Sequence, residues 1–146
     1  MELKVKEFPE LEAAELYRLL RLRVNVFVVE QNCPYPELDD LDQEALHVWL
    51  EENGRVLAYL RVLRPGAESE YAALGRVVTA RRGDGLGRRI LEEGIRLAEE
   101  RLGAKTLYLE AQVYAKGFYE KLGFRQCSPM FAIDGIPHVR MLREGA

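Results

Sequence analysis

Hydrophobic and polar residues alternate with a period of two at the start of the chain, where residues 2–8 read ELKVKEF. This alternation predicts a strand with one buried face. Pro9 follows and predicts the start of a helix, because proline is well tolerated at the first helical position. Helical spacing then places the next apolar residues on one face: Ala13, Leu16, Tyr17, Leu20 and Val24.

The run VNVFVV at 24–29 is rich in β-branched residues and by composition alone favours a strand. The apolar face of the preceding helix nevertheless continues through Phe27 and Val28, so we predict that the helix continues here. Residues 33–45, CPYPELDDLDQEA, combine two prolines with a concentration of acidic residues. This composition predicts a long ordered loop, and long loops inside compact domains are often functional.

The rest of the chain alternates between short strands and helices. Asn53-Gly54 separates two apolar runs, 46–52 and 55–63, which predicts a hairpin. The later elements are a strand at 73–80, a helix with its apolar face from Ile90 to Leu102 and its end at Gly103, a strand at 105–111, a short helix at 113–122 ended by Gly123, and a final hairpin of 124–133 with 136–142.

The predicted order of elements is therefore β-α-β-β-β-α-β-α-β-β. Some neighbouring strands are joined by hairpins and others by helical crossovers, so the sheet is expected to be mixed. The fold class that follows is α/β in the wide sense (α+β), with helices flanking a sheet that is mostly antiparallel.

Composition adds limits to this picture. The 146 residues fit one domain, which we expect to span 1–146. The net charge of −3 does not suit a protein that coats nucleic acid. The charged N-terminus is unlike a signal peptide, and no apolar run reaches the length of a membrane span. We therefore expect a cytoplasmic protein, with Cys33 and Cys127 as reduced, packed thiols.

The segment RGDGLGR at 82–88 lies between a predicted strand and a predicted helix. A helix N-terminus carries unpaired N–H groups and partial positive charge, and glycines let a ligand approach the backbone closely. These features favour an anion site of the phosphate kind, to which neighbouring arginines add charge. The Walker and Rossmann spacings are both absent, and a glycine-rich turn on a basic surface is the simpler alternative.

Two motifs together carry a family resemblance. RGDGLG fits the pattern [QR]xxGx[GA], and AKGFYEKLGF follows it after one strand. The pair resembles the GNAT superfamily, the Gcn5-related N-acetyltransferases, over nearly the whole chain. The stretches VFVVEQNCPYPELDDLD, GRVV and DGIPHVRM are similar to the ElaA-type subfamily. This resemblance implies a sheet of about seven strands whose central strands splay apart.

The resemblance also implies acetyl-CoA as co-substrate and assigns residues to it. In the family the glycine loop holds the pyrophosphate, and the strand before it pairs with the pantetheine arm. With the family's tyrosine and a frequent asparagine position added, the residues of this chain that the resemblance assigns to acetyl-CoA are Val77, Val78, Thr79, Arg82, Gly83, Asp84, Gly85, Leu86, Gly87, Arg88, Gln112 and Tyr119. Two departures stand out: the connection after the strand is about two residues shorter than usual, and Gln112 replaces a frequent asparagine.

Acetyl transfer needs a neutral amine, a polarised thioester carbonyl and a protonated leaving thiolate. A backbone N–H on the splayed strand is expected to polarise the carbonyl, and Tyr119, the family tyrosine, to protonate the sulfur. The candidate bases are Glu30, His47, Glu110 and His138. Each also has a structural alternative, such as a helix-end acid, a packed histidine or an ion pair.

The acceptor side is expected to be walled by loop 31–45, with Tyr35, His47, Glu110 and His138 as candidate substrate contacts and Glu30 as the favoured catalytic base. The acidic residues of this loop suit a cationic amine, and a solvated acidic loop is the alternative. The predicted function is N-acetylation of a primary amine on a small molecule or peptide, by direct attack in a ternary complex.

Other functions remain open on sequence alone. A GNAT module that binds acyl-CoA as a sensor or partner, without turnover, is the main alternative. A nucleic-acid binder using arginines 81, 82, 88 and 89 is disfavoured by the net negative charge. With two histidines and no Cys/His cluster, no metal is expected, nor is a membrane or nucleic-acid partner. A homodimer is compatible with the sequence.

Overall fold

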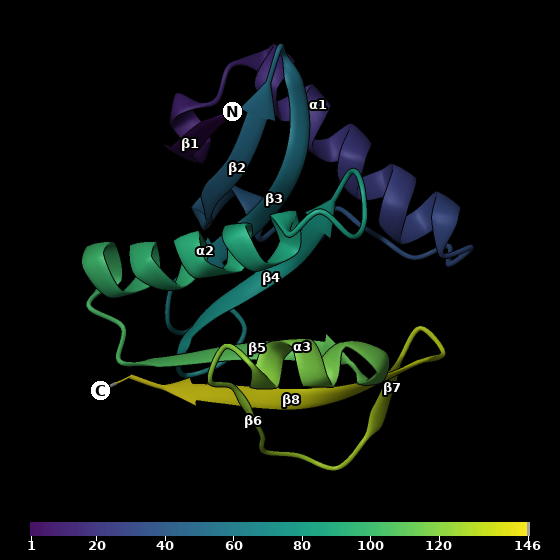
Figure 1. The fold of residues 1–146 in the computed structure, drawn as a ribbon, viewed down its shortest axis with the longest axis vertical. Helices are drawn as coiled ribbons and strands as arrows, with labels where there is room; N and C mark the ends of the chain where they lie inside the picture. Colours follow the sequence, from purple (N-terminus) through teal and green to yellow (C-terminus); the bar gives the residue numbers. More distant parts are fainter. Residues whose placement is uncertain (146) are drawn as a thin grey trace.

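The computed structural model describes residues 1–145 and contains one sheet with helices on both faces (Figure 1). The strands are β1 Glu2–Glu7, β2 Leu46–Glu52, β3 Arg55–Leu63, β4 Ala72–Thr79, β5 Thr106–Gln112, β6 Arg125–Gln126, β7 Phe131–Ile133 and β8 Ile136–Glu144. The α-helices are α1 Ala13–Val24, α2 Leu86–Leu102 and α3 Lys116–Glu120, with a π-helix at Asn25–Glu30 and short 3-10 turns at Phe8–Glu10, Asp42–Glu44 and Val113–Ala115.

The eight strands follow the order β1-β2-β3-β4-β5-β8-β6, and β7 pairs with the other end of β8. Every pairing is antiparallel except that of β4 with β5. This arrangement confirms the predicted mixed, mostly antiparallel α/β fold. The count is eight rather than about seven because the predicted strand 124–133 is divided into β6 and β7.

Alternation along the strands assigns each helix to one face of the sheet. On β2, Val48 and Leu50 belong to the core under α2, whereas Trp49 packs on the opposite face with Leu19 of α1. Successive strand residues point to opposite faces, so the two cores are separate. Phe118, next to α3's tyrosine, packs on the α2 side, which places α2 and α3 on the same face.

Two predicted helices differ in extent from the structure. Pro9 opens a 3-10 turn rather than the helix itself, and α1 starts after Glu12, whose backbone N–H donates to the Glu15 carboxylate at 2.9 Å in a capping box. This second cap restarts the helix. The predicted helix 113–122 is a 3-10 turn followed by the short α3. The predicted helical continuation through 25–29 is confirmed as a π-helix.

The predicted strand 124–133 is interrupted by Ser128-Pro129. The Ser128 hydroxyl accepts the Arg140 N–H at 2.9 Å and so replaces a ladder bond from the backbone. Proline has no N–H to donate, and it disfavours a regular ladder at this point. The chain therefore leaves β8 after β6 and returns to it in β7.

β4 and β5 are joined at one end and diverge along the rest of their length (Figure 1). Their parallel pairing consists of Ala72 with Leu107 and Ala73 with Tyr108. Beyond these pairs, the edge of β4 that faces β5 has no strand partner in residues 1–145. The central splay implied by the family resemblance is thus present, and it leaves room between the two halves of the sheet.

Candidate functional site

A cavity of about 830 Å³ fills the space where β4 and β5 diverge. It is lined by residues of both strands, by the glycine loop, by α3 and by the segment 26–41. The chain therefore brings elements that are distant in sequence to one hollow at the centre of the fold. A cavity of this size suits a small-molecule ligand with several contact regions.

The glycine loop forms one end of the cavity. Gly83 and Gly85 have φ values of +82° and +77°, in a region that residues with a side chain rarely adopt. Gly85 is the N-cap of α2, so the unpaired N–H groups of the first helical turn begin at Leu86. The loop also carries the exposed charges of Arg82 and Arg88. This geometry agrees with the predicted anion site.

β4 carries a bulge where it borders the cavity. Tyr59 pairs with Val78 and Arg61 pairs with Gly75, so β4 contains one more residue than β3 between these pairs. Arg76 is in the bulge and has a φ of +53°. Bulges redirect backbone groups and are frequent at functional sites. The bulge and the missing strand partner together leave backbone N–H and C=O groups of β4 available on the cavity side.

Tyr119 lines the cavity from α3, as predicted. Its ring packs edge-on against Phe118 and Phe124, at centroid distances of 5.3 Å and 6.2 Å. Burial, with a smaller contribution from the charge that Tyr114 would carry, raises the pKa of the Tyr119 hydroxyl to about 12. The hydroxyl is therefore protonated at neutral pH and able to donate a proton.

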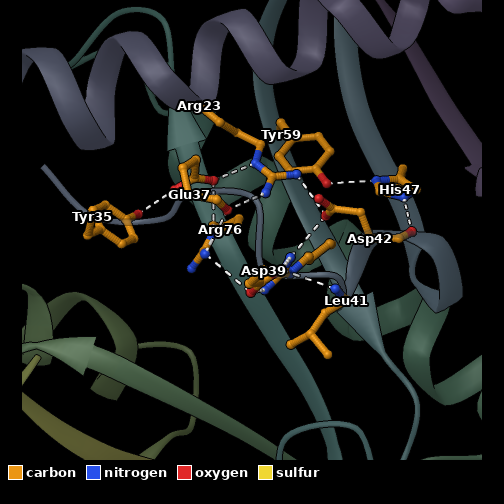
Figure 2. Close-up of polar contacts among 10 residues, drawn as sticks. Arg23, Tyr35, Glu37, Asp39, Leu41, Asp42, His47, Tyr59 and Arg76 are labelled. Atoms are coloured by element: carbon orange, nitrogen blue, oxygen red, sulfur yellow. Dashed lines mark hydrogen bonds and ion pairs between the residues drawn. The ribbon is translucent and has the colours of Figure 1, made fainter.

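The acidic loop is held by a network of buried ion pairs beneath α1 (Figure 2). Arg23 of α1 is 1% exposed. Its Nε donates to Glu37 Oε2 at 2.7 Å and its Nη1 donates to Asp42 Oδ1 at 2.8 Å. Glu37 is itself 4% exposed and also accepts the Tyr35 hydroxyl. These contacts fix the loop to the helix.

Two further arginines complete this network from the sheet. Arg76 Nε donates to Glu37 Oε2 at 2.8 Å, and Arg61 Nη1 donates to Asp39 Oδ1 and Asp42 Oδ1, each at 2.9 Å. Burial alone would raise the pKa of Asp39, but the hydrogen bond and charge of Arg61, with the charge of Arg76, outweigh it and lower the pKa to about 2.

The charges of Glu37, Asp39 and Asp42 are thus neutralised by arginines of the same chain. The suggestion that they attract a cationic acceptor is therefore wrong for these three residues, and so is the alternative of a solvated loop. The network instead holds the loop against the β4 bulge, where Cys33, Tyr35, Pro36, Asp39 and Leu41 form a wall of the cavity.

Comparison with known proteins identifies the family. Residues 16–144 match the Acetyltransferase (GNAT) domain. The chain belongs to the GNAT family. It is 37% identical over 139 residues to protein ElaA of Escherichia coli K12, and the alignment covers 92% of this chain and 91% of ElaA. It is 46% identical over 143 residues to a UPF0039 protein of Mycobacterium tuberculosis, covering 94% of this chain and 89% of that one.

Solved structures agree with this GNAT assignment. The crystal structure of an acyl-CoA N-acyltransferase from Pseudomonas aeruginosa superposes with a TM-score of 0.91 and 38% identity, covering 98% of this chain and 99% of that one. The crystal structure of E. coli ElaA gives a TM-score of 0.90 and 34% identity over 99% of this chain and all of that one. The predicted GNAT and ElaA-type resemblance is confirmed, and the family supports acyl transfer as the general activity.

Most of the predicted co-substrate and acceptor residues line the cavity of this GNAT chain. Gln112 reaches across toward Gln31, with 3.4 Å between the amide nitrogen and oxygen. His138 points its Nδ1 at the Ile136 carbonyl, 2.7 Å away. Glu110 accepts the Tyr108 hydroxyl at 2.6 Å. The predicted residues with a place in the lining are Tyr35, Val77, Val78, Thr79, Arg82, Gly83, Asp84, Gly85, Leu86, Gly87, Arg88, Glu110, Gln112, Tyr119 and His138.

Two predicted residues are not brought to the cavity. His47 is 1% exposed, and its ring nitrogens contact the Tyr59 hydroxyl at 2.7 Å and the Asp42 carbonyl at 2.9 Å. Burial lowers the pKa of its imidazole, so His47 is a neutral core histidine in the loop network. Glu30 is exposed at the end of the π-helix and is not among the residues of the described chain that line the cavity. The structure therefore does not support either residue as the base.

One lining residue was missed by the sequence analysis. Glu68 belongs to the loop between β3 and β4 and lies against Glu110. Its side chain is exposed, although neighbouring protein atoms still remove part of the water around its carboxyl group. Burial, followed by the charge of Glu110, raises the pKa of Glu68 to about 7. An isolated acid in a loop gives no sequence signal of this kind.

The remaining findings limit the kinds of site. A second hollow of about 490 Å³ is lined by charged side chains of α2 with Lys121 and Arg143, and none of the predicted site residues borders it.

Residues 1–145 contain no group of three or more His, Cys, Asp or Glu arranged to hold a metal ion. No helix in this range is both long and apolar enough to cross a membrane. Both cysteines are free, but Cys127 is exposed rather than packed as expected.

Proposed function

We propose that this chain transfers an acetyl group from acetyl-CoA to a primary amine, by direct attack within a ternary complex. One observation carries the proposal. A single cavity is lined by the glycine loop at the start of α2, the unpaired edge of β4 and the Tyr119 hydroxyl. A phosphate cradle, a strand edge and a proton donor are the three parts that a CoA thioester needs along its length.

The residues present fit acetyl-CoA. The N–H groups that follow Gly85 suit its phosphates, and Arg82 and Arg88 supply positive charge beside them. The open edge of β4 after Ala73 offers backbone groups to the amides of the pantetheine arm, as an added strand would use them. Glycine at 83 and 85 keeps the loop in its left-handed conformation and free of side chains.

The β4 bulge and Tyr119 catalyse the transfer. A backbone N–H of the bulge polarises the thioester carbonyl, which makes the carbon more electrophilic. The amine nitrogen bonds to this carbon, the C–S bond breaks, and the bonding electrons leave with the sulfur. Tyr119 gives its proton to the sulfur, because its raised pKa keeps the hydroxyl protonated until the thiolate forms.

The test is acetyl transfer to a panel of amines, measured as release of free thiol. The panel contains phenethylamine, putrescine, glycinamide and a tetra-alanine peptide with a free N-terminus. Because an exposed thiol such as Cys127 would add to the signal of a thiol reagent, the assay uses Cys127→Ser and subtracts the rate without amine. Acetyl-CoA binding without transfer to any amine would favour the alternative function, a non-catalytic acyl-CoA module.

Gly85→Glu tests the phosphate cradle. Glutamate adds a negative charge at the helix N-terminus and forces a side chain into a left-handed position. Gly85→Gln is the matched control, because it has the same backbone strain and size without the charge. Calorimetry is expected to show weaker acetyl-CoA binding for both variants and a further loss of about tenfold or more for glutamate. Equal affinities for wild type and Gly85→Glu would rule out the cradle.

Tyr119→Phe tests the proton donor. The substitution removes the hydroxyl and keeps the ring packing against Phe118 and Phe124. We expect kcat to fall by about 10²-fold at constant acetyl-CoA affinity. Full kcat under conditions where the chemical step limits the rate would remove Tyr119 from the mechanism.

A further inference from the structure

The acceptor side of the cavity contains two acids that form no ion pair with the arginines of the loop network in residues 1–145. Glu68 comes from the loop between β3 and β4, Glu110 comes from β5, and both line the cavity. They are close enough for the negative charge of Glu110 to act on Glu68. Glu110 also accepts the Tyr108 hydroxyl at 2.6 Å, which fixes its orientation.

The surroundings of this pair are polar and partly unsatisfied. Arg61 lines the same cavity, is 2% exposed, and its Nε–H has no acceptor within residues 1–145. The other nitrogens of Arg61 are bound to Asp39 and Asp42. The wall beside the pair thus retains a buried donor for an oxygen that the chain does not supply, as expected where a polar ligand completes a site.

We propose that Glu68 and Glu110 act as a paired base that receives the acceptor amine as its ammonium form and removes its protons. This inference rests on the proposed acetyl transfer and names the acceptor class as a primary amine that is cationic in solution. Both residues border the cavity that Tyr119 and the β4 bulge also border. The base and the proton donor therefore border the same cavity.

The reaction removes two protons from the ammonium group. The pair takes one proton from the ammonium group and releases it to water, which leaves a neutral amine. The nitrogen bonds to the carbonyl carbon, and the pair takes the second proton from it as the C–S bond breaks. The sulfur receives the Tyr119 proton, the pair releases the second proton to water, and Tyr119 recovers one proton from water. Overall, one ammonium and one thioester give one amide, one thiol and one free proton.

Charged groups on every neighbouring element affect this pair. Burial and the charge of Glu110 raise the pKa of Glu68, whereas Arg61 on β3 and Arg76 on β4 act in the opposite direction. Arg140 and His138 of β8 lie opposite Glu110 and Gln112 in the strand register. The balance leaves Glu68 with a pKa of about 7, which suits a general base at neutral pH.

The kinetic test uses the amine of the panel that gives the fastest thiol release. We expect kcat/KM of the wild type to rise with pH through an inflection near 7. Glu68→Gln should lower kcat/KM by about 10²-fold and remove this inflection, while acetyl-CoA affinity stays the same. Glu110→Gln should shift the inflection to lower pH, because the neighbouring negative charge is gone. Glu70→Gln, an exposed acid in the same loop, is the matched control and should behave as wild type.

A second measurement needs no acceptor. Carbon NMR of glutamate labelled at the carboxyl group should show one titration near pH 7 that disappears in Glu68→Gln and moves to lower pH in Glu110→Gln. Absence of that titration overturns the pairing. If amines are acetylated but Glu68→Gln keeps the wild-type rate and pH profile, the base assignment is wrong and the proposed function stands. If the titration is present and no amine is acetylated, both are overturned.

Discussion

Two groups of acids lie beside one cavity, and the pKa is lowered in one group and raised in the other. Glu37, Asp39 and Asp42 meet arginines, and the pKa of Asp39 falls to about 2. Glu68 meets Glu110, and its pKa rises to about 7. Burial raises the pKa in both places, so the difference comes from the partner. A buried acid next to an arginine stays ionised and acts as a structural anchor, whereas one next to another acid has a raised pKa and can exchange a proton near neutral pH.

The same arginines act on both groups. Arg61 and Arg76 lower the pKa of Asp39 and also lower that of Glu68, yet they do not reverse the shift of Glu68. Their guanidinium groups donate their hydrogen bonds to the loop acids. Because these arginines form ion pairs with the loop acids, they do not form ion pairs with Glu68 and Glu110 in residues 1–145.

Arg23→Met should produce the largest change in stability. It leaves the buried carboxylates of Glu37 and Asp42 without their shared partner from α1. Breaking a buried pair in this way costs about 3–5 kcal/mol of the free energy of unfolding. Urea denaturation measures the loss, and Arg21→Met, an exposed arginine of the same helix, is the control. A loss below 1 kcal/mol would mean that the network contributes little to stability.

Acid should weaken the loop network next. The pKa of Asp39 is lower in the folded chain than its ordinary value of 3.8, so its stabilising contribution is complete above about pH 4 and is lost as pH falls through about 2. The contribution is about 2 kcal/mol. Denaturation midpoints measured from pH 5 to pH 2 should fall less steeply for Asp39→Asn than for Asp40→Asn, whose side chain is exposed. Parallel curves for the two variants would contradict the pKa shift.

Glu68→Gln should change stability least, because water screens the charge of this exposed side chain. The change is expected to be a gain, whereas Arg23→Met loses stability. The pKa of Glu68 is higher in the folded chain than its ordinary value of 4.5, so the fold loses stability as pH rises from about 4.5 to about 7. Glu68→Gln should thus be slightly more stable than wild type at pH 8.5 and equal to it near pH 4. Thermal denaturation at both pH values measures the difference. A variant less stable than wild type at pH 8.5 would break the contrast between the two groups of acids.

Much of the fold could be predicted because its signals are local. The alternation in 2–8, the Asn53-Gly54 turn and the apolar face of the second helix each specify one element within a few residues. The boundaries that failed depend on single polar contacts, such as the capping box at Glu12 and the Ser128 hydroxyl in the last hairpin. Periodicity carries no information about such contacts.

The site was only partly predictable for a related reason. The glycine loop and Tyr119 lie in contiguous motifs, and the structure places both at the cavity. The partners of the loop acids are far away in sequence: Glu37 meets Arg76, 39 residues later. Glu68 and Glu110 are brought together only by the packing of the loop before β4 against β5. Such pairs arise from the tertiary fold, and a single sequence does not reveal them.

The short contact between β4 and β5 also has a mechanical consequence. Two residue pairs form the seam between the halves of the sheet, whereas the pairing of β5 with β8 runs from Thr106 to Gln112. Few backbone hydrogen bonds must break to separate the halves, and apolar residues of α2 such as Ile90 and Leu91 share one core with strands of both halves. In amide exchange the seam is expected to open first, so the hollow at the centre of the protein is also its hinge line.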